Sequence, residues 1–297
     1  MTTVATIRIG TRGSRLALAQ AAIAAEALAP FLGPLEIVPM STRGDVISER
    51  RARGGWVESD GQFTQDLDRA LLAGEIDLVV HSYKDLPTAQ VAGLVVAAVL
   101  PRADARDCLM SREGWALADL PFGARIGTSS PRRAAQLAAV RPDLVAMPIR
   151  GNVDTRLRRL MRGEFDAVLL AAAGLDRLEV PVPHTARLPF DVVLPAPAQG
   201  ALALQVRSDA DAVRAAVAHV DHTPTRVAVE AERMLLRHLG GGCLVPLGAL
   251  GEVVGEGIRL RAAYEDPSDG YRRAEAFGAV ADVGAVVERV AAGVRGS

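Results

Sequence analysis

Two segments of the chain begin alike and lead into the same order of elements. Residues 9–14 read IGTRGS and residues 126–133 read IGTSSPRR, each after a short apolar stretch and before an Ala- and Leu-rich helical pattern. Further along, GEID at 74–77 is matched by GEFD at 163–166. Strings this short can match by chance, but the common order of elements favours an internal repeat. Each copy predicts strand, turn, helix, strand, helix, strand, which is typical of an α/β lobe with a largely parallel sheet.

The sequence changes character after about residue 215. A helical pattern at 223–239 ends at three glycines, strand-like segments follow at 246–253, 258–264 and 271–277, and a last helical pattern covers 279–294. Glycine directly after a periodic run is a common helix stop, and short strands separated by turn residues indicate a small sheet. We therefore expect two similar α/β lobes and a smaller C-terminal α+β domain.

Composition narrows the class of protein. The 297 residues are enough for two or three domains, and 34 basic against 35 acidic side chains disfavour nucleic acid as the main partner. The longest apolar run, residues 91–100, is too short to span a bilayer, and residues 1–20 hold no apolar run of signal-peptide type. Two cysteines in a chain of this length favour a reducing compartment. We expect a cytoplasmic protein that binds neither membranes nor nucleic acid.

Basic residues stand where a helix normally prefers acidic ones. Ser14 and Arg15 open the first helical pattern of one copy, and Ser130-Pro131-Arg132-Arg133 opens that of the other. A helix N-terminus is already partly positive, so guanidinium groups there destabilise the helix unless an anion binds. The hydroxyls of Thr128, Ser129 and Ser130 add donors for a carboxylate or a phosphate. The alternative is a solvated face, in a chain whose basic residues are almost all arginine.

More arginines follow the predicted strands. Arg43, Arg150, Arg156 and Arg177 all stand at such positions. Ligands of α/β sheets bind beyond the carboxyl ends of the strands, so we expect these side chains to meet in one cleft between the lobes. That cleft suits a ligand with several anionic groups. A nucleotide is disfavoured because neither a Walker-type glycine-lysine loop nor a Gly-x-Gly-x-x-Gly fingerprint follows the first strand.

Lys84 is the only lysine of the chain and precedes Asp85 after the most apolar strand of the first lobe. A lysine kept in an arginine-rich chain indicates a role that arginine cannot fill. Asp85 at the strand end could transfer a proton or stabilise a developing cation. The alternative is that Lys84 and Asp85 form an ordinary capping pair.

The two cysteines stand in different contexts. Cys243 follows three glycines, whereas Cys108 enters an apolar strand. An accessible thiol is a candidate nucleophile or covalent anchor, and the alternative is a small buried residue at a helix-to-strand turn. No catalytic triad can be assembled around Cys243. The five histidines lack the spacing to Cys or Glu that a metal site requires, so we expect no metal.

Seven short motifs follow one another between about residues 7 and 250. They are IGTRGS at 9–14, TRGD at 42–45, VHSYKDLPT at 80–88, IGTSSPRR at 126–133, RGN at 150–152, LPAPAQGA at 194–201 and GGCLVP at 241–246. Together, and in this order, they resemble the porphobilinogen deaminase, or hydroxymethylbilane synthase, family.

The resemblance implies an α/β protein with two periplasmic-binding-protein-like lobes and a small C-terminal α+β domain. The implied domains are residues 1–100 with 196–215, residues 101–195, and residues 216–297, the last carrying the cofactor cysteine. The implied enzyme is a monomeric cytoplasmic transferase of haem biosynthesis. It would join four porphobilinogen molecules head to tail onto a dipyrromethane cofactor, with loss of ammonia, and release hydroxymethylbilane by hydrolysis.

The resemblance also implies roles for individual residues. Cys243 would carry the cofactor through a thioether, and Asp85 would be the catalytic carboxylate. The residues that would hold cofactor or substrate are Arg12, Ser14, Asp45, Phe63, Lys84, Thr128, Ser129, Ser130, Arg132, Arg133, Arg150, Arg156, Arg177 and Gln199.

One segment departs from the family pattern. The family has a glycine- and lysine-rich loop before Phe63, whereas residues 49–63 read ERRARGGWVESDGQF. Asp60 stands where a lysine is expected and would repel a polyanionic ligand. The altered loop supports one alternative, a relative with impaired catalysis. A second alternative, a two-lobed small-anion-binding protein without chemistry, would also explain the repeat and the anion sites.

Overall fold

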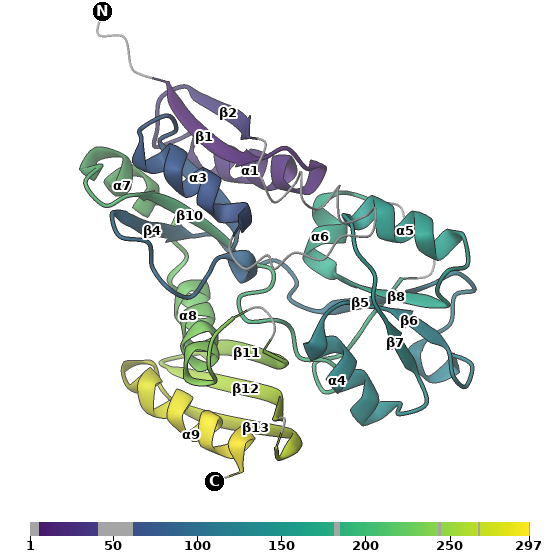
Figure 1. Ribbon diagram of the computed structural model, residues 1–297. Coiled ribbons are helices and arrows are strands. Elements are labelled where there is room, and N and C mark those ends of the chain that lie inside the picture. The colour runs from purple at the N-terminus through teal and green to yellow at the C-terminus, as the bar shows by residue number, and fades with distance from the viewer. Residues whose placement is uncertain (1–5, 41–61, 181–184, 243–244, 267, 297) are drawn as a thin grey trace, which may run out of the picture. The chain divides into compact units, whose positions relative to one another are not determined.

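The computed structural model describes residues 6–40, 62–180, 185–242, 245–266 and 268–296 (Figure 1). The chain forms two compact units, Met1–Arg102 with Ala201–Arg226 and Ala103–Gly200 with Val227–Ser297. No helix in the described ranges is long and apolar enough to cross a membrane.

The first unit is a five-stranded sheet covered by helices on both faces. Its strand order is β2 (Leu35–Met40), β1 (Ile7–Arg12), β3 (Leu78–Ser82), β10 (Leu202–Arg207) and β4 (Leu94–Val99). β1 is parallel to β2 and β3, and β10 is antiparallel to β3 and β4. The helices are α1 (Arg15–Leu28) and α7 (Asp211–Ala218) on one face and α3 (Gln62–Leu72) on the other.

The second unit contains a sheet of the same design. Its order is β7 (Val145–Met147), β6 (Arg125–Gly127), β8 (Ala167–Ala171), β5 (Asp107–Ser111) and β9 (Thr185–Arg187). β6 is parallel to β7 and β8, and β5 is antiparallel to β8 and β9. The helices of this lobe are α4 (Pro131–Val140), α5 (Val153–Met161) and α6 (Ala172–Arg177), and Leu117–Asp119 forms a 3-10 turn.

The internal repeat predicted from the sequence is confirmed by matching ion pairs. The backbone N–H of Arg8 donates to Asp77 at 2.9 Å, and its guanidinium also reaches the Gly74 carbonyl at 2.7 Å. In the second lobe the N–H of Arg125 donates to Asp166 at 2.8 Å, and its guanidinium reaches the Gly163 carbonyl at 3.1 Å. The repeated GEID and GEFD strings therefore place the same carboxylate against the first strand of each lobe.

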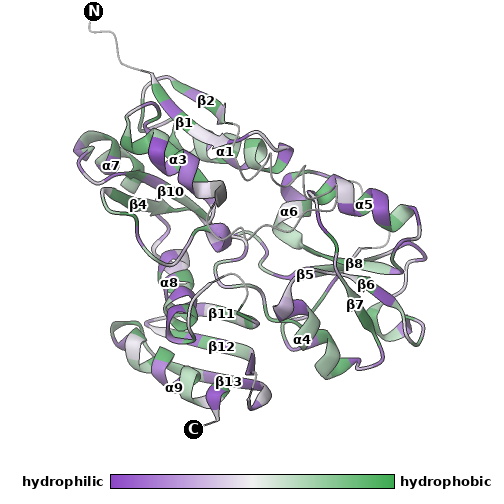
Figure 2. Ribbon diagram, viewed as in Figure 1, coloured by the Kyte–Doolittle hydropathy of each residue, from purple (hydrophilic) through white to green (hydrophobic). Residues whose placement is uncertain are grey.

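The C-terminal part of the second unit is an antiparallel sheet of β11 (Leu247–Val254), β12 (Gly257–Asp266) and β13 (Gly270–Ala279). Helices α8 (Thr223–His238) and α9 (Val283–Arg295) bury Leu235 and Val290 against this sheet. Figure 2 shows hydrophilic and hydrophobic residues alternating along both helices, as expected where one face is buried. The last helix begins four residues later than predicted because Ala279 still pairs with Gly257 and Val280–Asp282 forms a 3-10 turn.

The predicted fold class, two α/β lobes with a small α+β domain, is thus confirmed. The parallel part of each sheet was expected, and each sheet adds two strands through antiparallel pairs. The boundaries of the three predicted domains stay a prediction.

Candidate active site

In the first unit, candidate residues lie at the carboxyl ends of β1 and β3. These strands are parallel neighbours, so both ends lie at the same edge of the sheet. Arg12 ends β1, and Lys84 and Asp85 belong to the 3-10 turn Tyr83–Asp85 directly after β3. Arg12 and Lys84 are half-buried, whereas Asp85 is exposed. This edge therefore presents one carboxylate to solvent and also carries two basic side chains.

Ser14 connects β1 to its helix. Its hydroxyl accepts a hydrogen bond from the Ala17 N–H at 3.3 Å and so caps α1, whose first turn contains no acidic residue. Arg15, the first residue of the helix, is exposed. The helix start is thus positive both by its dipole and by its side chain, as the sequence predicts.

The end of β3 is held by side chains that the sequence analysis did not single out. On one face, Gln20 of α1 donates to the Ser82 hydroxyl at 2.8 Å, and that hydroxyl donates back to the Gln20 amide oxygen at 3.0 Å. On the other face, His81 Nε2 lies 2.9 Å from Gln205 Oε1 of β10. His81 and Ser82, the last two residues of β3, are therefore fixed from both sides of the sheet.

In the second unit, three helices begin at one edge of the sheet, because α4, α5 and α6 follow parallel strands. Ser130 caps α4 by accepting from the Arg133 N–H at 3.4 Å. Ser129 donates its hydroxyl proton to the Ile149 carbonyl at 2.8 Å and accepts from the Ile149 N–H at 3.0 Å. Ser129 thereby joins the hydroxyl-bearing loop 128–130 to the segment that carries Arg150.

The remaining predicted arginines of this lobe lie on the loops and helices after β7 and β8. Arg150 is exposed, and Arg156 donates to the Gly151 carbonyl at 2.8 Å. Arg177 of α6 donates to the Gly200 carbonyl at 2.7 Å. Burial lowers the pKa of Arg177 to about 10, so this side chain is still a cation at neutral pH. The structure therefore brings Arg150 and Arg156 to the edge that bears the 128–130 hydroxyls.

Arg132 and Arg133 have an internal partner that sequence reasoning missed. Asp107, fully buried at the start of β5, accepts from Arg132 at 2.7 Å, from Arg133 at 2.6 Å and from Gln199 at 2.9 Å. Burial acts to raise the pKa of Asp107, but the two guanidinium charges and their hydrogen bonds outweigh it and hold the pKa well below its ordinary value. The only signal in the sequence is an acidic residue at the head of an apolar strand.

This cluster carries surplus positive charge, because two guanidiniums share one carboxylate. The Nε atoms of Arg132 and Arg133 are buried and have no hydrogen-bond partner in the described part of the chain. They belong to the first turn of α4, which contains no acidic residue and follows the hydroxyls of Thr128, Ser129 and Ser130. Cationic, hydroxyl and helix-terminal donors together suit carboxylate groups. A ligand contact of Arg132, Arg133 or Gln199 stays a prediction.

Three predicted site residues lie outside what the structure describes. They are Asp45, Cys243 and the side chain of Phe63, and the loop with Asp60 lies there as well. The glycines before Cys243 are described: Gly240, Gly241 and Gly242 have φ values of 103°, 64° and 99°. Three successive left-handed residues explain why glycines occupy the three positions before the cysteine.

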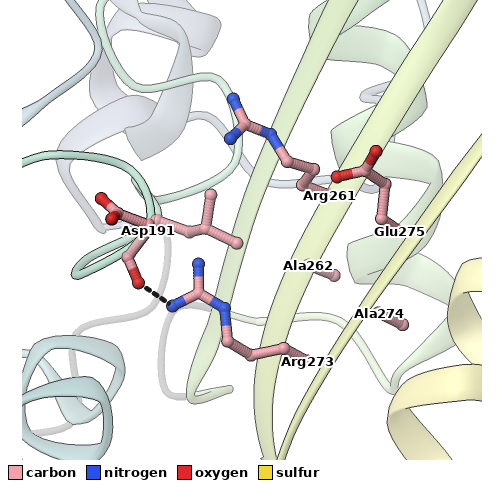
Figure 3. Close-up of a pocket in the computed structure, with 7 residues that line it drawn as sticks. Asp191, Arg261, Ala262, Arg273, Ala274 and Glu275 are labelled. Carbon is pink, nitrogen blue, oxygen red and sulfur yellow. Dashed lines mark hydrogen bonds between the residues drawn. The ribbon is translucent and has the colours of Figure 1, made fainter. Parts of the chain in front are cut away.

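None of the predicted site residues lines a pocket that the structure shows in the second unit (Figure 3). Arg261 and Arg273 of the C-terminal sheet line it together with Asp191 and Glu275. Arg273 donates to the Phe190 carbonyl at 2.8 Å, and Arg261 donates to Glu252 at 2.7 Å. Both arginines are thus engaged in joining elements of the fold. Among the residues described, no three His, Cys, Asp or Glu side chains are grouped to hold a metal ion.

Comparison with known families gives matches over most of the chain. Residues 7–215 match "Porphobilinogen deaminase, dipyromethane cofactor binding domain", and residues 227–293 match "Porphobilinogen deaminase, C-terminal domain". The porphobilinogen deaminase of Nocardia farcinica is 50% identical over 248 residues, which cover 84% of this chain and 70% of that protein. The porphobilinogen deaminase of Xanthomonas euvesicatoria is 44% identical over 292 residues, which cover 97% of this chain and 95% of that protein.

Comparison with solved structures also gives matches to solute-binding proteins. An ancestral cationic amino acid solute-binding protein is 15% identical with a TM-score of 0.43, over 72% of this chain and 87% of the other. An arginine-specific periplasmic binding protein of Salmonella typhimurium is 13% identical with a TM-score of 0.40, over 72% of this chain and 91% of the other.

Proposed function

The chain belongs to the porphobilinogen deaminase family, and we propose that the exposed carboxylate of Asp85 is its catalytic group. The protein is a transferase of tetrapyrrole biosynthesis with a dipyrromethane cofactor. Four porphobilinogen molecules are joined head to tail, each losing ammonia, and water releases hydroxymethylbilane. The names of the relatives do not favour a small-anion receptor.

The position of Asp85 is the observation that carries the assignment. Loss of ammonia from porphobilinogen leaves positive charge on the pyrrole and its methylene carbon. A fixed carboxylate stabilises that charge and accepts hydrogen bonds from pyrrole N–H groups. Asp85 is exposed on a turn whose preceding strand is held by the Gln20–Ser82 and His81–Gln205 pairs. A carboxylate on a rigid strand end does not have to reorganise as the charge develops.

The second lobe supplies the donors that the cofactor needs. When bound, dipyrromethane supplies the pyrrole carbon to which the first porphobilinogen is joined. We assign its attachment to Cys243, and its acetate and propionate groups to Arg132, Arg133 and the hydroxyls of Thr128 and Ser130. Ser129, whose hydroxyl proton goes to the Ile149 carbonyl, positions this loop. The surplus positive charge around Asp107 and the unpaired Nε–H groups support this assignment.

The other predicted residues hold the growing chain, which adds two carboxylates with every porphobilinogen. This set is Arg12, Ser14, Asp45, Phe63, Lys84, Arg150, Arg156, Arg177 and Gln199. We further propose that the protein acts as a cytoplasmic monomer on porphobilinogen, with neither nucleic acid nor a membrane as a partner.

The test compares Asp85→Ala with Asp209→Ala, an exposed carboxylate in the turn after β10. Asp85→Ala is expected to keep the melting temperature and to lower kcat at least ~100-fold, the scale on which a transition-state charge partner acts. Asp209→Ala is expected to match the wild type. An unimpaired rate for Asp85→Ala would remove the proposed role.

The covalent cofactor is tested separately by mass. The wild-type protein is expected to weigh more than its sequence by two linked pyrroles, and Cys243→Ser is expected to lack that excess. An excess that persists in Cys243→Ser would place the attachment on another residue.

A further inference from the structure

Three buried polar side chains form a hydrogen-bonded triad inside the first lobe, on the sheet face covered by α3. They are Asp68 of α3, Gln205 of β10 and His81 of β3, which are 7%, 5% and 6% exposed. Gln205 lies opposite Val79, two residues before His81, so both side chains point to the same face. His81 is itself only three residues before Lys84 and four before Asp85.

The hydrogen bonds of this triad have a fixed direction. Gln205 Oε1 lies 2.9 Å from His81 Nε2, and an amide oxygen can only accept, so the proton of the His81 ring is on Nε2. With its oxygen toward His81, Gln205 turns its amide N–H groups to the Asp68 carboxylate, which is its other hydrogen-bond partner. The second oxygen of Asp68, Oδ1, is buried and has no partner among the described residues. Asp68 therefore fixes Gln205, and Gln205 fixes His81.

The second lobe provides an internal comparison, because it repeats the first. Asp166 corresponds to Asp77, an offset of 166 − 77 = 89 residues. With this offset, Asp68 and His81 correspond to Leu157 and Leu170. Gln205 lies opposite Val79, and the residue opposite the corresponding Val168 is Met110.

All three corresponding residues are apolar and pack in one core cluster. Met110 is 1% exposed, Leu170 is 4% exposed, and Leu157 packs against them. The fold of a lobe therefore does not need polar side chains at these positions. Burying polar groups is unfavourable unless they are well paired, so their presence in one lobe alone indicates a function.

The two lobes also differ at the strand end above these residues. The positions that correspond to Lys84 and Asp85 are Ala173 and Gly174, which are buried and carry no charge. Of the two lobes, the one that bears the candidate catalytic turn thus has the polar triad, and the other has apolar residues at the same positions.

We propose that Asp68 is a positioning residue for the Lys84–Asp85 turn, acting through Gln205 and His81. Gln205, held by Asp68, keeps His81 in the Nε2–H tautomer and fixes its ring, and His81 fixes the end of β3. The inference rests on the proposed role of Asp85, which is the group being positioned.

The charged groups on the elements packed against Asp68 have partners of their own or lie at the sheet edge. Asp66 pairs with Arg69 on α3, Arg8 of β1 pairs with Asp77, and Arg207 of β10 pairs with Asp209. Arg12 ends β1 at the edge, and His81 is the titratable group of β3. Burial is the main cause that raises the pKa of Asp68 to about 6, and the hydrogen bond from Gln205 partly offsets it.

The first test compares the histidine signals of the wild type with those of Asp68→Asn. In cofactor-loaded protein labelled with 15N-histidine, His81 is expected to show the neutral Nε2–H tautomer, and its ring signals are expected to shift with a midpoint near pH 6 as Asp68 titrates. Asp68→Asn keeps an oxygen for the Gln205 amide, so the tautomer is expected to stay and the midpoint to disappear. An Nδ1–H tautomer in the wild type, or the same midpoint in Asp68→Asn, would overturn the inference.

The second test separates positioning from packing. Asp68→Leu removes the acceptor, and we expect kcat to fall about 10-fold, with KM changed less than about twofold, because misplaced catalytic groups lower the rate of the chemical step. Asp68→Asn is expected to restore most of kcat. Asp209→Leu, which changes an exposed carboxylate in the same way, is expected to behave like the wild type.

A triple variant covers the case in which Asp68→Leu does not fold. Asp68→Leu with Gln205→Met and His81→Leu copies the apolar packing of the second lobe and is expected to melt no lower than the wild type. It is expected to show the same loss of kcat, and wild-type kcat in a folded triple variant would refute the inference. If the wild type itself turned over no porphobilinogen, the proposed function would fail. The histidine signals would still show whether Asp68 acts on His81 through Gln205.

Discussion

Removing the charge of Asp107 is expected to destabilise the second lobe strongly. In Asp107→Asn the side chain keeps its shape, but Arg132 and Arg133 lose their shared counter-charge. Both guanidiniums stay buried, because they are 4% and 6% exposed in the folded protein. The loss is therefore that of a buried ion pair broken on one side.

The size of the effect follows from burial. Breaking a buried pair by removing one partner costs about 3–5 kcal/mol. In the matched variant Asp166→Asn, the pair Arg125–Asp166 has side chains 45% and 25% exposed, so solvent screens the pair and a much smaller loss is expected. Since 1 kcal/mol moves the melting temperature of a domain of this size by roughly 2–4 °C, Asp107→Asn is expected to melt roughly 6–20 °C lower.

Calorimetry of the two variants and the wild type measures this difference, and its pH dependence gives a second check. The pKa of Asp107 is lowered in the folded protein, so its contribution is present above the unfolded pKa of about 3.9 and is lost as pH falls towards the folded pKa. The gap between wild type and Asp107→Asn should stay constant from pH 8 to 5 and shrink below about pH 4. A shift in Asp107→Asn no larger than that in Asp166→Asn would refute the reasoning.

Two more predictions follow from buried groups. Asp68→Leu is expected to lose more stability than the wild type when the pH falls from about 6.5 to 4.5. Burial lowers the pKa of His81 to about 4 in the folded protein. As the pH falls, His81 therefore gains a proton in the unfolded chain but not in the folded protein, and this destabilises the wild type and Asp68→Leu alike. Burial raises the pKa of Asp68 to about 6, so the folded wild type gains a compensating proton that the variant cannot. Urea unfolding at the two pH values measures the losses, and equal losses would contradict this account. Cys108 is buried and its pKa is raised to about 11, chiefly by burial, so iodoacetamide at pH 8 should label it only in denatured protein. Peptide mass spectrometry detects the label, and rapid labelling of folded protein would show that the β5 strand opens.

The sequence predicts the local elements of the fold well because they depend on local patterns. The helix at 223–239 and the three C-terminal strands are observed within a few residues of their predicted limits. The place of β10 could not be predicted from periodicity. That strand lies between β3 and β4 although it is more than 100 residues away in sequence, and only the assembled sheet fixes this neighbourhood.

The site divides in the same way. The sequence predicts the place of Arg150 and of the 128–130 hydroxyls at a sheet edge, because strand ends and helix starts are visible in the sequence. The carboxylate under Arg132 and Arg133 was not found, because Asp107 reaches them only through the pairing of β5 with β8, which places Asp107 opposite Ala171. The sequence predicts these arginines as donors to a ligand, and the structure adds a buried anion that holds them in place.

The two lobes share one sheet design but differ in their buried polar groups. The ion pairs Arg8–Asp77 and Arg125–Asp166 fix the same strands in both, so the frame itself is common. The buried polar groups are not common: one lobe has Asp68, Gln205 and His81 below a carboxylate turn, and the other has Asp107 below an arginine-bearing helix start. Each set lies next to the edge that carries that lobe's candidate chemistry. A buried polar group without a counterpart in the sister lobe is therefore a signal of function, because the sister lobe demonstrates that the fold forms without it.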